Sequence, residues 1–442
     1  MRRQAGLAGT GRRDTLGRMT RVAGFFAPDH LTVILCLALA PLLAAGCATG
    51  PKPLPHAPPE AVGMDGEKLD RAVDLYRRAV EEDELRNAVL LVARDGTVVL
   101  HEAVGWRCLE KGSSEKESSG KASSGNGPSG NGPSGGGEPI EPDALFRMAS
   151  NTKAVVCAAA LVLEEEGVLN MDDPVGRWIP AFSEGEFADI TVRHLATHTS
   201  GLPRSPIFFD DLDEGTTLKR EAARFAEKLE LENEPGAEYG YSNVGYNVLG
   251  GVIEAAAGTT LDDVLRTRLF EPLGMDDTCN HESTADRRRM SDVYRLSDGQ
   301  WTLRWSPDDE PDYPLVRASG GMISSAADFA VFMQMLLDGG RYGRTRILSE
   351  DAARRAVSPL VEAGNSSYGY GWRVDDDGVF RHGGSDGTYA WADPSNSVFV
   401  LIFTQSSRGE NPRDEFIELV TEAIVDDGDH TQRRAEKAGG GP

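Results

Sequence analysis

Cysteine is scarce in this sequence, and its few cysteines form no pattern typical of a metal site. The 442 residues include five cysteines, and two of them, Cys36 and Cys47, lie within the first 47 residues. The other three, Cys108, Cys157 and Cys279, allow at most one disulfide, so at least one thiol remains free. The sequence has no CxxC pair and no Cys/His cluster, so a structural zinc site has no support.

Positive charge is also in short supply. The chain has 46 lysines and arginines against 70 aspartates and glutamates, which gives a formal net charge of -24. Such a surface repels phosphate backbones, so we do not expect nucleic acid as a partner. Apolar residues make up 40% of the chain, which suits a globular protein with a large core.

The apolar run at residues 31–45 is too short to span a membrane comfortably, which takes about 20 residues. Arginines precede it, as in the basic and apolar regions of a secretory signal. The run leads into Ala44-Ala45-Gly46-Cys47, which resembles a bacterial lipobox, although Ala44 stands where leucine is usual. We predict that residues 1–47 are a signal peptide and that Cys47 is lipidated. The protein would then be exported to the periplasmic side of the cell envelope and anchored to a membrane. Plain cleavage by signal peptidase and an uncleaved anchor are the alternatives.

Composition divides the rest of the chain into three segments, the second of which contains an insertion. Residues 48–62 are rich in proline and predict an extended tether. Residues 63–428 carry the periodic patterns of a folded domain, and residues 429–442 predict a disordered tail. Within the domain, residues 111–138 consist largely of Ser, Gly, Asn and Pro, so they predict a disordered insertion at a loop tip.

Strand patterns occupy both ends of the domain, and helical patterns fill its middle. Residues 88–93 and 97–104 flank Asp95-Gly96, a hairpin signal, and four more strand-like runs lie between residues 368 and 404. Helical periodicity occurs at residues 150–166 and 326–337, and Asn411-Pro412 predicts an N-cap and first residue of the last helix. We therefore predict an α+β fold. One antiparallel sheet is built from both chain ends and flanked by helices, with a mostly helical lobe inserted.

The first chemical motif is Ser150-Asn151-Thr152-Lys153, at the start of an apolar helix. At about 100° per residue, Ser150 and Lys153 share one face of that helix, and the face is apolar. A lysine there loses hydration, so its pKa falls and it can take the proton of the serine hydroxyl. The alternative is a surface serine and lysine at a helix start.

The second motif is Tyr241-Ser242-Asn243. A tyrosine near an ammonium group can ionise below its usual pKa of about 10 and shuttle a proton. Asn243 offers a donor and an acceptor, which could hold a substrate amide or the lysine. The alternative is a core tyrosine followed by an N-capping Ser242 or Asn243.

The third motif, His382-Gly383-Gly384-Ser385, lies at the end of a predicted strand. Glycines there allow a substrate to lie against the strand backbone. The backbone N–H of Ser385 could form an oxyanion hole with that of Ser150. The alternative is a simple β-turn.

Two further patterns resemble known motifs, but each lacks a part that the motif requires. Residues 383–387 match G-x-S-x-G, but that motif needs a helix directly after the serine, whereas residues 388–391 predict a strand. His194 and His198 have the i, i+4 spacing of metal ligands, but Leu195 replaces the glutamate of H-E-x-x-H. We expect these histidines to be structural hydrogen-bonding residues near the site.

The three motifs, in this order and with these spacings, resemble the serine β-lactamase and penicillin-binding-protein superfamily, in its class C β-lactamase, D,D-peptidase and esterase branch. The supporting segments are residues 146–153, 169–175, 190–202 and 319–322. The resemblance implies an acyl-enzyme on Ser150, with Lys153 and Tyr241 handling protons and Asn243 contacting a small-molecule or peptide substrate. It implies no metal or other cofactor.

One departure from the family pattern lies at the third motif. Well-known β-lactamases carry Lys-Thr-Gly there, where this chain has His382, Gly383 and Gly384. A mostly neutral histidine removes a fixed cation that would bind a substrate carboxylate, so we expect weak β-lactam hydrolysis. Esterase and D,D-peptidase activities remain open. The alternative is a penicillin-binding-type sensor that is acylated, or only binds a ligand, without turnover.

Overall fold

The computed structural model describes residues 52–109, 137–204 and 215–425. The predicted signal peptide with Cys47 and the predicted tail at 429–442 lie outside these ranges. The predicted insertion also lies outside them, except for Gly137 and Glu138, which belong to strand β3. Within these ranges, no helix is both apolar enough and long enough to cross a membrane.

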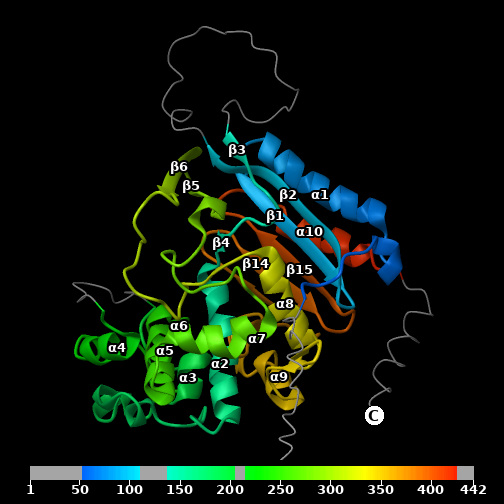
Figure 1. The fold of residues 1–442 in the computed structure, drawn as a ribbon. Coiled ribbons are helices and arrows are strands. Elements are labelled where there is room, and N and C mark those ends of the chain that lie inside the picture. Colours follow the sequence, from blue (N-terminus) through cyan, green and yellow to red (C-terminus); the bar gives the residue numbers. More distant parts are fainter. Residues whose placement is uncertain (1–51, 110–136, 205–214, 426–442) are drawn as a thin grey trace, which may run out of the picture. The chain divides into compact units, whose positions relative to one another are not determined.

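The centre of the domain is a nine-stranded sheet in the order β10-β11-β12-β13-β14-β15-β1-β2-β3. Strand β1 (Asn87–Arg94) pairs antiparallel with β15 (Val398–Phe403), so Leu91 lies opposite Leu401. The first and last long strands are therefore neighbours, and the sheet is antiparallel and built from both chain ends, as predicted (Figure 1).

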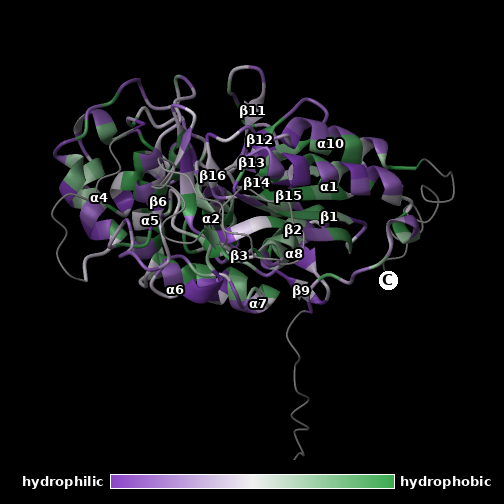
Figure 2. Cartoon of the chain, turned by 90° about the horizontal axis from the view of Figure 1, so that it is seen from above, coloured by the Kyte–Doolittle hydropathy of each residue, from purple (hydrophilic) through white to green (hydrophobic). Residues whose placement is uncertain are grey.

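Side chains of the central strands alternate between two cores. In β1, Val89 and Leu91 face one apolar cluster, whereas Leu90 and Val92 face the other. Helices α1 (Gly66–Glu81) and α10 (Arg413–Glu422) cover one face of the sheet, and α8 (Ala326–Leu337) covers the opposite face (Figure 1). Figure 2 shows the apolar strands as a green layer between these helices. Burial on both faces explains why β1 is almost wholly apolar.

The other strands and helices have the following bounds. The strands are β2 (Thr97–Leu109), β3 (Gly137–Pro139), β4 (Phe146–Arg147), β5 (Val293–Ser297), β6 (Gln300–Trp305), β7 (Ile323–Ser324), β8 (Arg341–Tyr342), β9 (Thr345–Arg346), β10 (Val361–Glu362), β11 (Ser367–Tyr368), β12 (Arg373–Val374), β13 (Phe380–Gly383), β14 (Tyr389–Asp393) and β16 (Ser406–Ser407). The helices are α2 (Thr152–Glu165), α3 (Val192–Ala196), α4 (Leu218–Ala226), α5 (Asn243–Ala257), α6 (Leu261–Leu265), α7 (Glu271–Leu273) and α9 (Glu350–Ala356). Helices α3 to α7 form the predicted inserted lobe beside α2 (Figure 1).

Two local predictions are wrong. Residues 52–62 are not an extended tether, because Leu54 is buried and the N–H of Val98 donates to the carbonyl of Pro55. A proline lacks a donor but keeps its carbonyl, so this segment can still pair with the edge of a strand. The last helix begins at Arg413 with Pro412 at its N-cap, while Asn411 instead accepts a hydrogen bond from Tyr76.

Candidate active site

Ser150 lies in a short 3₁₀ turn, Ala149–Asn151, that leads directly into α2. Strand β4, just before it, is fixed by antiparallel pairing with β7. Ala149 has a φ of 45°, in the left-handed region that non-glycine residues rarely adopt. Such backbone strain is typical of sites where the fold imposes the orientation of a neighbouring side chain.

Lys153 lies one helical turn after Ser150, and its side chain is completely buried. Its Nζ atom lies 3.0 Å from Oγ of Ser150, 2.9 Å from Oδ1 of Asn243 and 2.6 Å from the carbonyl oxygen of Ser319. The amide and carbonyl oxygens can only accept hydrogen bonds. In the neutral amine they occupy both N–H groups, and the lone pair is left for the hydroxyl proton of Ser150.

The environment of Lys153 favours the neutral amine. Burial lowers the pKa of Lys153 well below its ordinary value of 10.5, and the nearby Arg317 guanidinium lowers it further. Arg317 is itself buried, with its guanidinium carbon 3.8 Å from the ring centroid of Tyr313. The direction of the pKa shift agrees with the prediction from the helical face.

Tyr241 completes the group around Ser150. Its hydroxyl donates a hydrogen bond of 2.9 Å to Oγ of Ser150, and Nζ of Lys153 lies 4.9 Å from the centroid of its ring. However, burial raises the pKa of Tyr241 to about 12. The prediction that this phenol ionises below 10 is therefore wrong. It assumed an ammonium group beside the ring, but burial also disfavours that ammonium.

His198 and Ser242 hold Tyr241 in place. The ring of His198 lies 4.2 Å from that of Tyr241, and its Nδ1 accepts a hydrogen bond of 3.0 Å from the N–H of Ser242. Ser242 also caps α5, because its Oγ accepts from the N–H of Gly245. His198 is thus a structural hydrogen-bonding residue near the site, as expected. His194 has a similar role at the start of α3, where it forms a capping box with Thr191.

The third motif ends strand β13, and His382 is buried there. Its Nδ1 lies 3.1 Å from the carbonyl oxygen of Gly383, and its Nε2 lies 3.2 Å from the hydroxyl of Tyr368. These partners fit the neutral tautomer that donates from Nδ1 and accepts at Nε2. Burial, assisted by the charge of Lys153, lowers the pKa of His382 to about 3. This motif therefore carries no fixed cation, in line with the sequence prediction.

Gly384 joins the third motif to the Ser150 segment. A Cβ atom at Gly384 would lie 2.3 Å from Oγ1 of Thr388 and 2.7 Å from the carbonyl oxygen of Met148. Thr388 itself donates to that carbonyl at 3.1 Å and accepts from Asn151 at 3.0 Å. Strand β14 follows, as predicted, instead of the helix that a G-x-S-x-G elbow requires.

Two partners of Lys153 were not predicted from the sequence. The Ser319 carbonyl accepts a hydrogen bond from Lys153, and the Arg317 guanidinium lowers the pKa of Lys153. Both groups belong to the segment 317–322, in which Gly320 allows close approach to Ala149. The glycine pair at 320–321 is a signal for such an approach, but glycines alone do not indicate which backbone they meet.

Comparison with known proteins places the chain in a family. The model of the Beta-lactamase family matches residues 72–423. The chain belongs to this family. A curated relative of Escherichia coli (strain K12), named "Putative D-alanyl-D-alanine carboxypeptidase", is 24% identical over 407 residues, which cover 82% of this chain and 88% of the relative. A protein of the same name from Salmonella typhimurium is 25% identical over 395 residues, covering 79% and 85%.

Solved structures share the fold. EstCE1, described as a hydrolase with promiscuous acyltransferase activity, has a TM-score of 0.64 at 22% identity and covers 81% of this chain and 99% of its own. The D-amino acid amidase of Ochrobactrum anthropi has a TM-score of 0.61 at 23% identity, covering 80% and 98%. Family membership makes this chain a serine hydrolase of the esterase, D,D-peptidase or β-lactamase kind, which acts on small-molecule or peptide substrates.

Proposed function

We propose that Ser150 is the nucleophile of an acyl transfer from an ester or amide substrate to water. The observation that carries this proposal is the triangle of Ser150, Tyr241 and the buried Lys153, in which Oγ lies 3.0 Å from Nζ and 2.9 Å from the phenol oxygen. A nucleophile within hydrogen-bond reach of a base with a lowered pKa is the usual arrangement for forming a covalent intermediate.

In the first step, Oγ of Ser150 attacks the substrate carbonyl carbon while its proton moves to the neutral amine of Lys153. Asn243 and the Ser319 carbonyl hold the amine, so little reorganisation accompanies the proton transfer. The new ammonium group lies beside the faces of Tyr241 and Tyr246, at 4.9 and 5.4 Å from their ring centroids. Cation–π attraction stabilises that charge.

In the second step, the tetrahedral intermediate expels its alcohol or amine and leaves an acyl-serine. With a pKa near 12, Tyr241 acts as a neutral phenol that gives its proton to the leaving group and regains one from the Lys153 ammonium. Water then attacks the acyl-serine by the reverse proton path, which restores the Ser150 hydroxyl and releases the acid.

The substrate carbonyl oxygen would sit between the backbone N–H groups of Ser150 and Ser385. No described residue accepts a hydrogen bond from the N–H of Ser385, which leaves it available for an oxyanion. Asn243, His382, Gly383 and Gly384 would line the substrate's path, with the side-chain amide of Asn243 as a polar contact. Because His382 is neutral, we propose ester or peptide substrates in preference to β-lactams.

A panel of three substrates tests this assignment: a p-nitrophenyl ester, a D-Ala-D-Ala peptide and a chromogenic cephalosporin. We expect ester or peptide turnover by the unmodified protein, and loss of turnover together with the covalent adduct in Ser150→Ala. Turnover retained by a folded Ser150→Ala protein would refute the nucleophile. An adduct without turnover on any substrate would favour the sensor alternative, and rapid cephalosporin hydrolysis would refute the role given to His382.

We also propose that the protein is exported and that Cys47 is lipidated. The lipobox-like sequence supports this proposal, and D,D-carboxypeptidases and β-lactamases are typically exported proteins. Intact-mass analysis of the membrane fraction would show a diacylglyceryl adduct on a chain beginning at Cys47. A chain of that length without lipid, or one still carrying residues 1–46, would contradict this proposal.

A further inference from the structure

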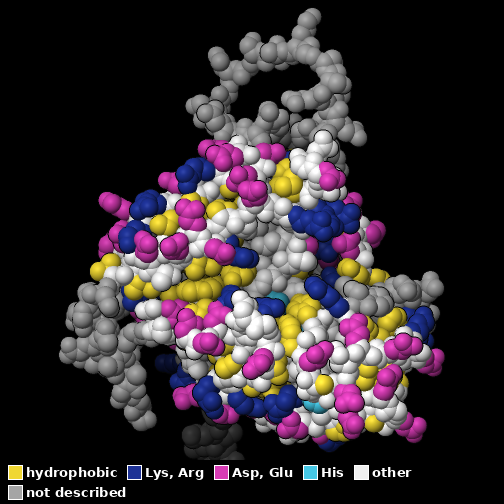
Figure 3. Space-filling model, turned by 180° about the vertical axis from the view of Figure 1, so that it is seen from behind, with side chains coloured by type: hydrophobic (Ala, Val, Ile, Leu, Met, Phe, Trp, Pro, Cys, Tyr) yellow, Lys and Arg dark blue, Asp and Glu magenta, His cyan; other side chains and the backbone are white. Residues whose placement is uncertain are grey.

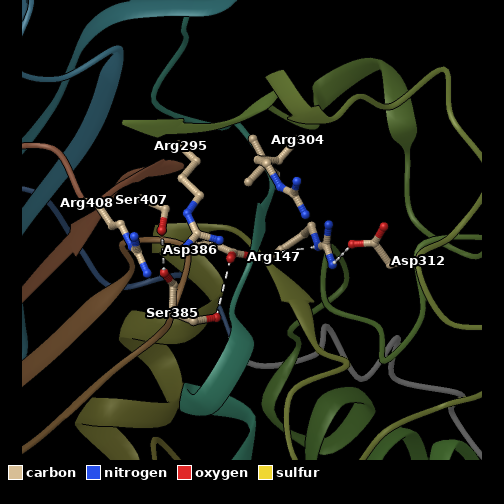
Figure 4. A pocket seen from close by; sticks show the side chains of 9 residues that line it. Arg147, Arg295, Arg304, Asp312, Ser385, Asp386, Ser407 and Arg408 are labelled. Atoms are coloured by element: carbon tan, nitrogen blue, oxygen red, sulfur yellow. Dashed lines mark hydrogen bonds and ion pairs between the residues drawn. The ribbon is translucent and has the colours of Figure 1, made fainter. Parts of the chain in front are cut away.

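A pocket of about 440 Å³ lies next to the third motif and is rich in arginine (Figure 4). Its lining combines four arginines with two aspartates, and we call it the arginine pocket. The lining residues are Arg147, Val293, Arg295, Arg304, Asp312, Ser385, Asp386, Ser407 and Arg408. Figure 3 shows basic side chains around a hollow near the middle of one face, while acidic side chains are spread over the rest.

Only one of the four arginines is neutralised by the described part of the protein. Arg147 forms ion pairs with Glu282 at 3.4 Å, Asp312 at 2.8 Å and Asp386 at 3.9 Å. Its guanidinium is therefore engaged on several sides. In contrast, the other three, Arg295, Arg304 and Arg408, have no ion-pair partner within the described ranges. Three uncompensated guanidinium groups around one pocket are unusual in a chain with a net charge of -24.

The backbone directs these three arginines to the pocket. The register of β5 and β6 shifts between Val293 and Tyr294, so that Arg304 is an extra residue at a β-bulge. Bulges redirect side chains, and Figure 4 shows Arg304 and Arg295 extending from this hairpin toward Arg147 and Asp386. Arg408 has a φ of 66°, a left-handed conformation that costs a non-glycine residue about 1 kcal/mol or more.

The arginine pocket adjoins the reactive serine through continuous backbone. Arg147 precedes Ser150 by three residues, and Ser385 directly follows Gly384. On its other side, the hydroxyl of Ser407 donates 3.1 Å to the Ser385 carbonyl, and Ser407 pairs with Arg295 of β5. A molecule bound at Ser150 could therefore extend past Ser385 into the pocket.

We infer that the arginine pocket binds a multiply charged oxyanion, a phosphate or a polycarboxylate, carried by the substrate away from the bond that is cleaved. Guanidinium groups pair with both oxyanions through charge-assisted hydrogen bonds, and three of them favour more than a single negative charge. This inference rests on the proposed function only for the statement that the bound molecule is the substrate.

Direct binding tests the pocket without any catalysis. Inorganic phosphate and tricarballylate are titrated by calorimetry into the full-length Ser150→Ala protein and into the same protein with Arg295→Gln and Arg304→Gln. We expect binding of at least one probe, weakened about tenfold or more by the double change. The tighter probe identifies the anion class. No binding of either probe, or equal binding by the double variant, would overturn the inference.

A matched control removes two arginines elsewhere. Arg341→Gln with Arg344→Gln also deletes two exposed guanidinium groups from a β-hairpin, β8–β9, that lines no part of the pocket. We expect this control to bind the probe as tightly as the parent Ser150→Ala protein does. If the control lost as much affinity as the Arg295→Gln/Arg304→Gln protein, the lower number of positive charges would explain the loss, and the inference would be overturned. If the double variant does not fold, Arg408→Gly removes a guanidinium at a backbone conformation that glycine adopts without strain.

A second measurement connects the pocket to the reaction. We expect a higher kcat/KM for 5-acetoxyisophthalate, a dicarboxylate, or for 3-acetoxyphenyl phosphate than for phenyl acetate, with the preference lost in Arg295→Gln/Arg304→Gln. Equal kcat/KM for charged and neutral esters would overturn the assignment of the anion to the substrate. Hydrolysis of none of the esters would count against the proposed function, while the calorimetry would still decide whether the pocket binds anions.

Discussion

The Nζ atom of Lys153 lies 3.0 Å from Oγ of Ser150, and two acceptors that cannot donate, Asn243 Oδ1 and the Ser319 carbonyl, occupy its other bonding directions. This arrangement orients the amine lone pair toward the hydroxyl once the amine is neutral. Burial supplies the neutral state by lowering the pKa of Lys153. Each of these features can be tested separately.

Replacing Lys153 by methionine should alter how stability depends on pH. In the folded protein the pKa of Lys153 lies below its ordinary 10.5, so between these two values the unfolded chain binds the extra proton. The free energy of unfolding therefore rises with pH there, by about 1.4 kcal/mol per pH unit for this one group. Urea unfolding at pH 7 and 9.5 should show wild type gaining stability relative to Lys153→Met. A constant difference between the two proteins would mean that the amine is not perturbed.

Replacing Tyr241 by phenylalanine should lower kcat by about 100-fold, because the leaving group loses its proton donor while the ring still packs on His198. Because the pKa of Tyr241 is near 12, the pH profile of kcat/KM near pH 10 should have the same shape in wild type and in the variant. Pre-steady-state kinetics over pH 6–10.5 would check this. A tyrosine-dependent change near pH 10 would show that the phenol ionises as a base.

His382 should make the folding stability of the protein sensitive to acid, although it stays neutral near pH 7. The folded-state pKa of about 3 lies below the ordinary 6.5, so the unfolded state binds the proton first as pH falls from 6.5 to 3. Folding stability is therefore lost across that window. The variant His382→Gln should lose less stability between pH 6.5 and 4 than wild type, as measured by urea unfolding. An NMR titration of His382 with a midpoint near 6.5 would contradict this account.

The two glycines of the third motif should respond differently to alanine. At Gly384 a Cβ atom would meet Thr388 Oγ1 at 2.3 Å, whereas at Gly383 the nearest atom would be 3.4 Å away, on Tyr389. We expect Gly384→Ala to cost about 1–3 kcal/mol of unfolding free energy and Gly383→Ala to cost less than about 1 kcal/mol. Thermal unfolding of the pair would test this, and equal losses would argue that the close approach of Gly384 to Thr388 is unimportant for stability.

The sequence predicts the features that follow from local pattern. Helical spacing places Lys153 beside Ser150 on an apolar face, and strand-like runs with hairpin signals at both chain ends predict the sheet in which β1 meets β15. The error at Tyr241 arose from burial, which raises the pKa of the phenol, while burial of Lys153 lowers the pKa of the amine and disfavours the ammonium group that the prediction assumed. Spacing alone carries no information on burial of that kind.

Features that depend on long-range contacts were not predicted. The Ser319 carbonyl reaches Lys153 across 166 residues of chain. The arginine pocket draws Arg147, Arg295 and Arg408 from three distant segments, so no single stretch of sequence signals it. The prediction that the site lacks a fixed cation holds for His382 itself, whereas the cations beside it come from elsewhere in the fold.

The most direct test of the central claim is the pH dependence of Ser150 acylation. The burst rate with a p-nitrophenyl ester, with the adduct mapped to the peptide that contains Ser150, should reach half its maximum well below pH 10.5, as expected for a desolvated lysine base. The variant Lys153→Arg, which keeps a permanent positive charge, should lose the burst. A half-maximum near 10.5, or an undiminished burst in Lys153→Arg, would contradict the account.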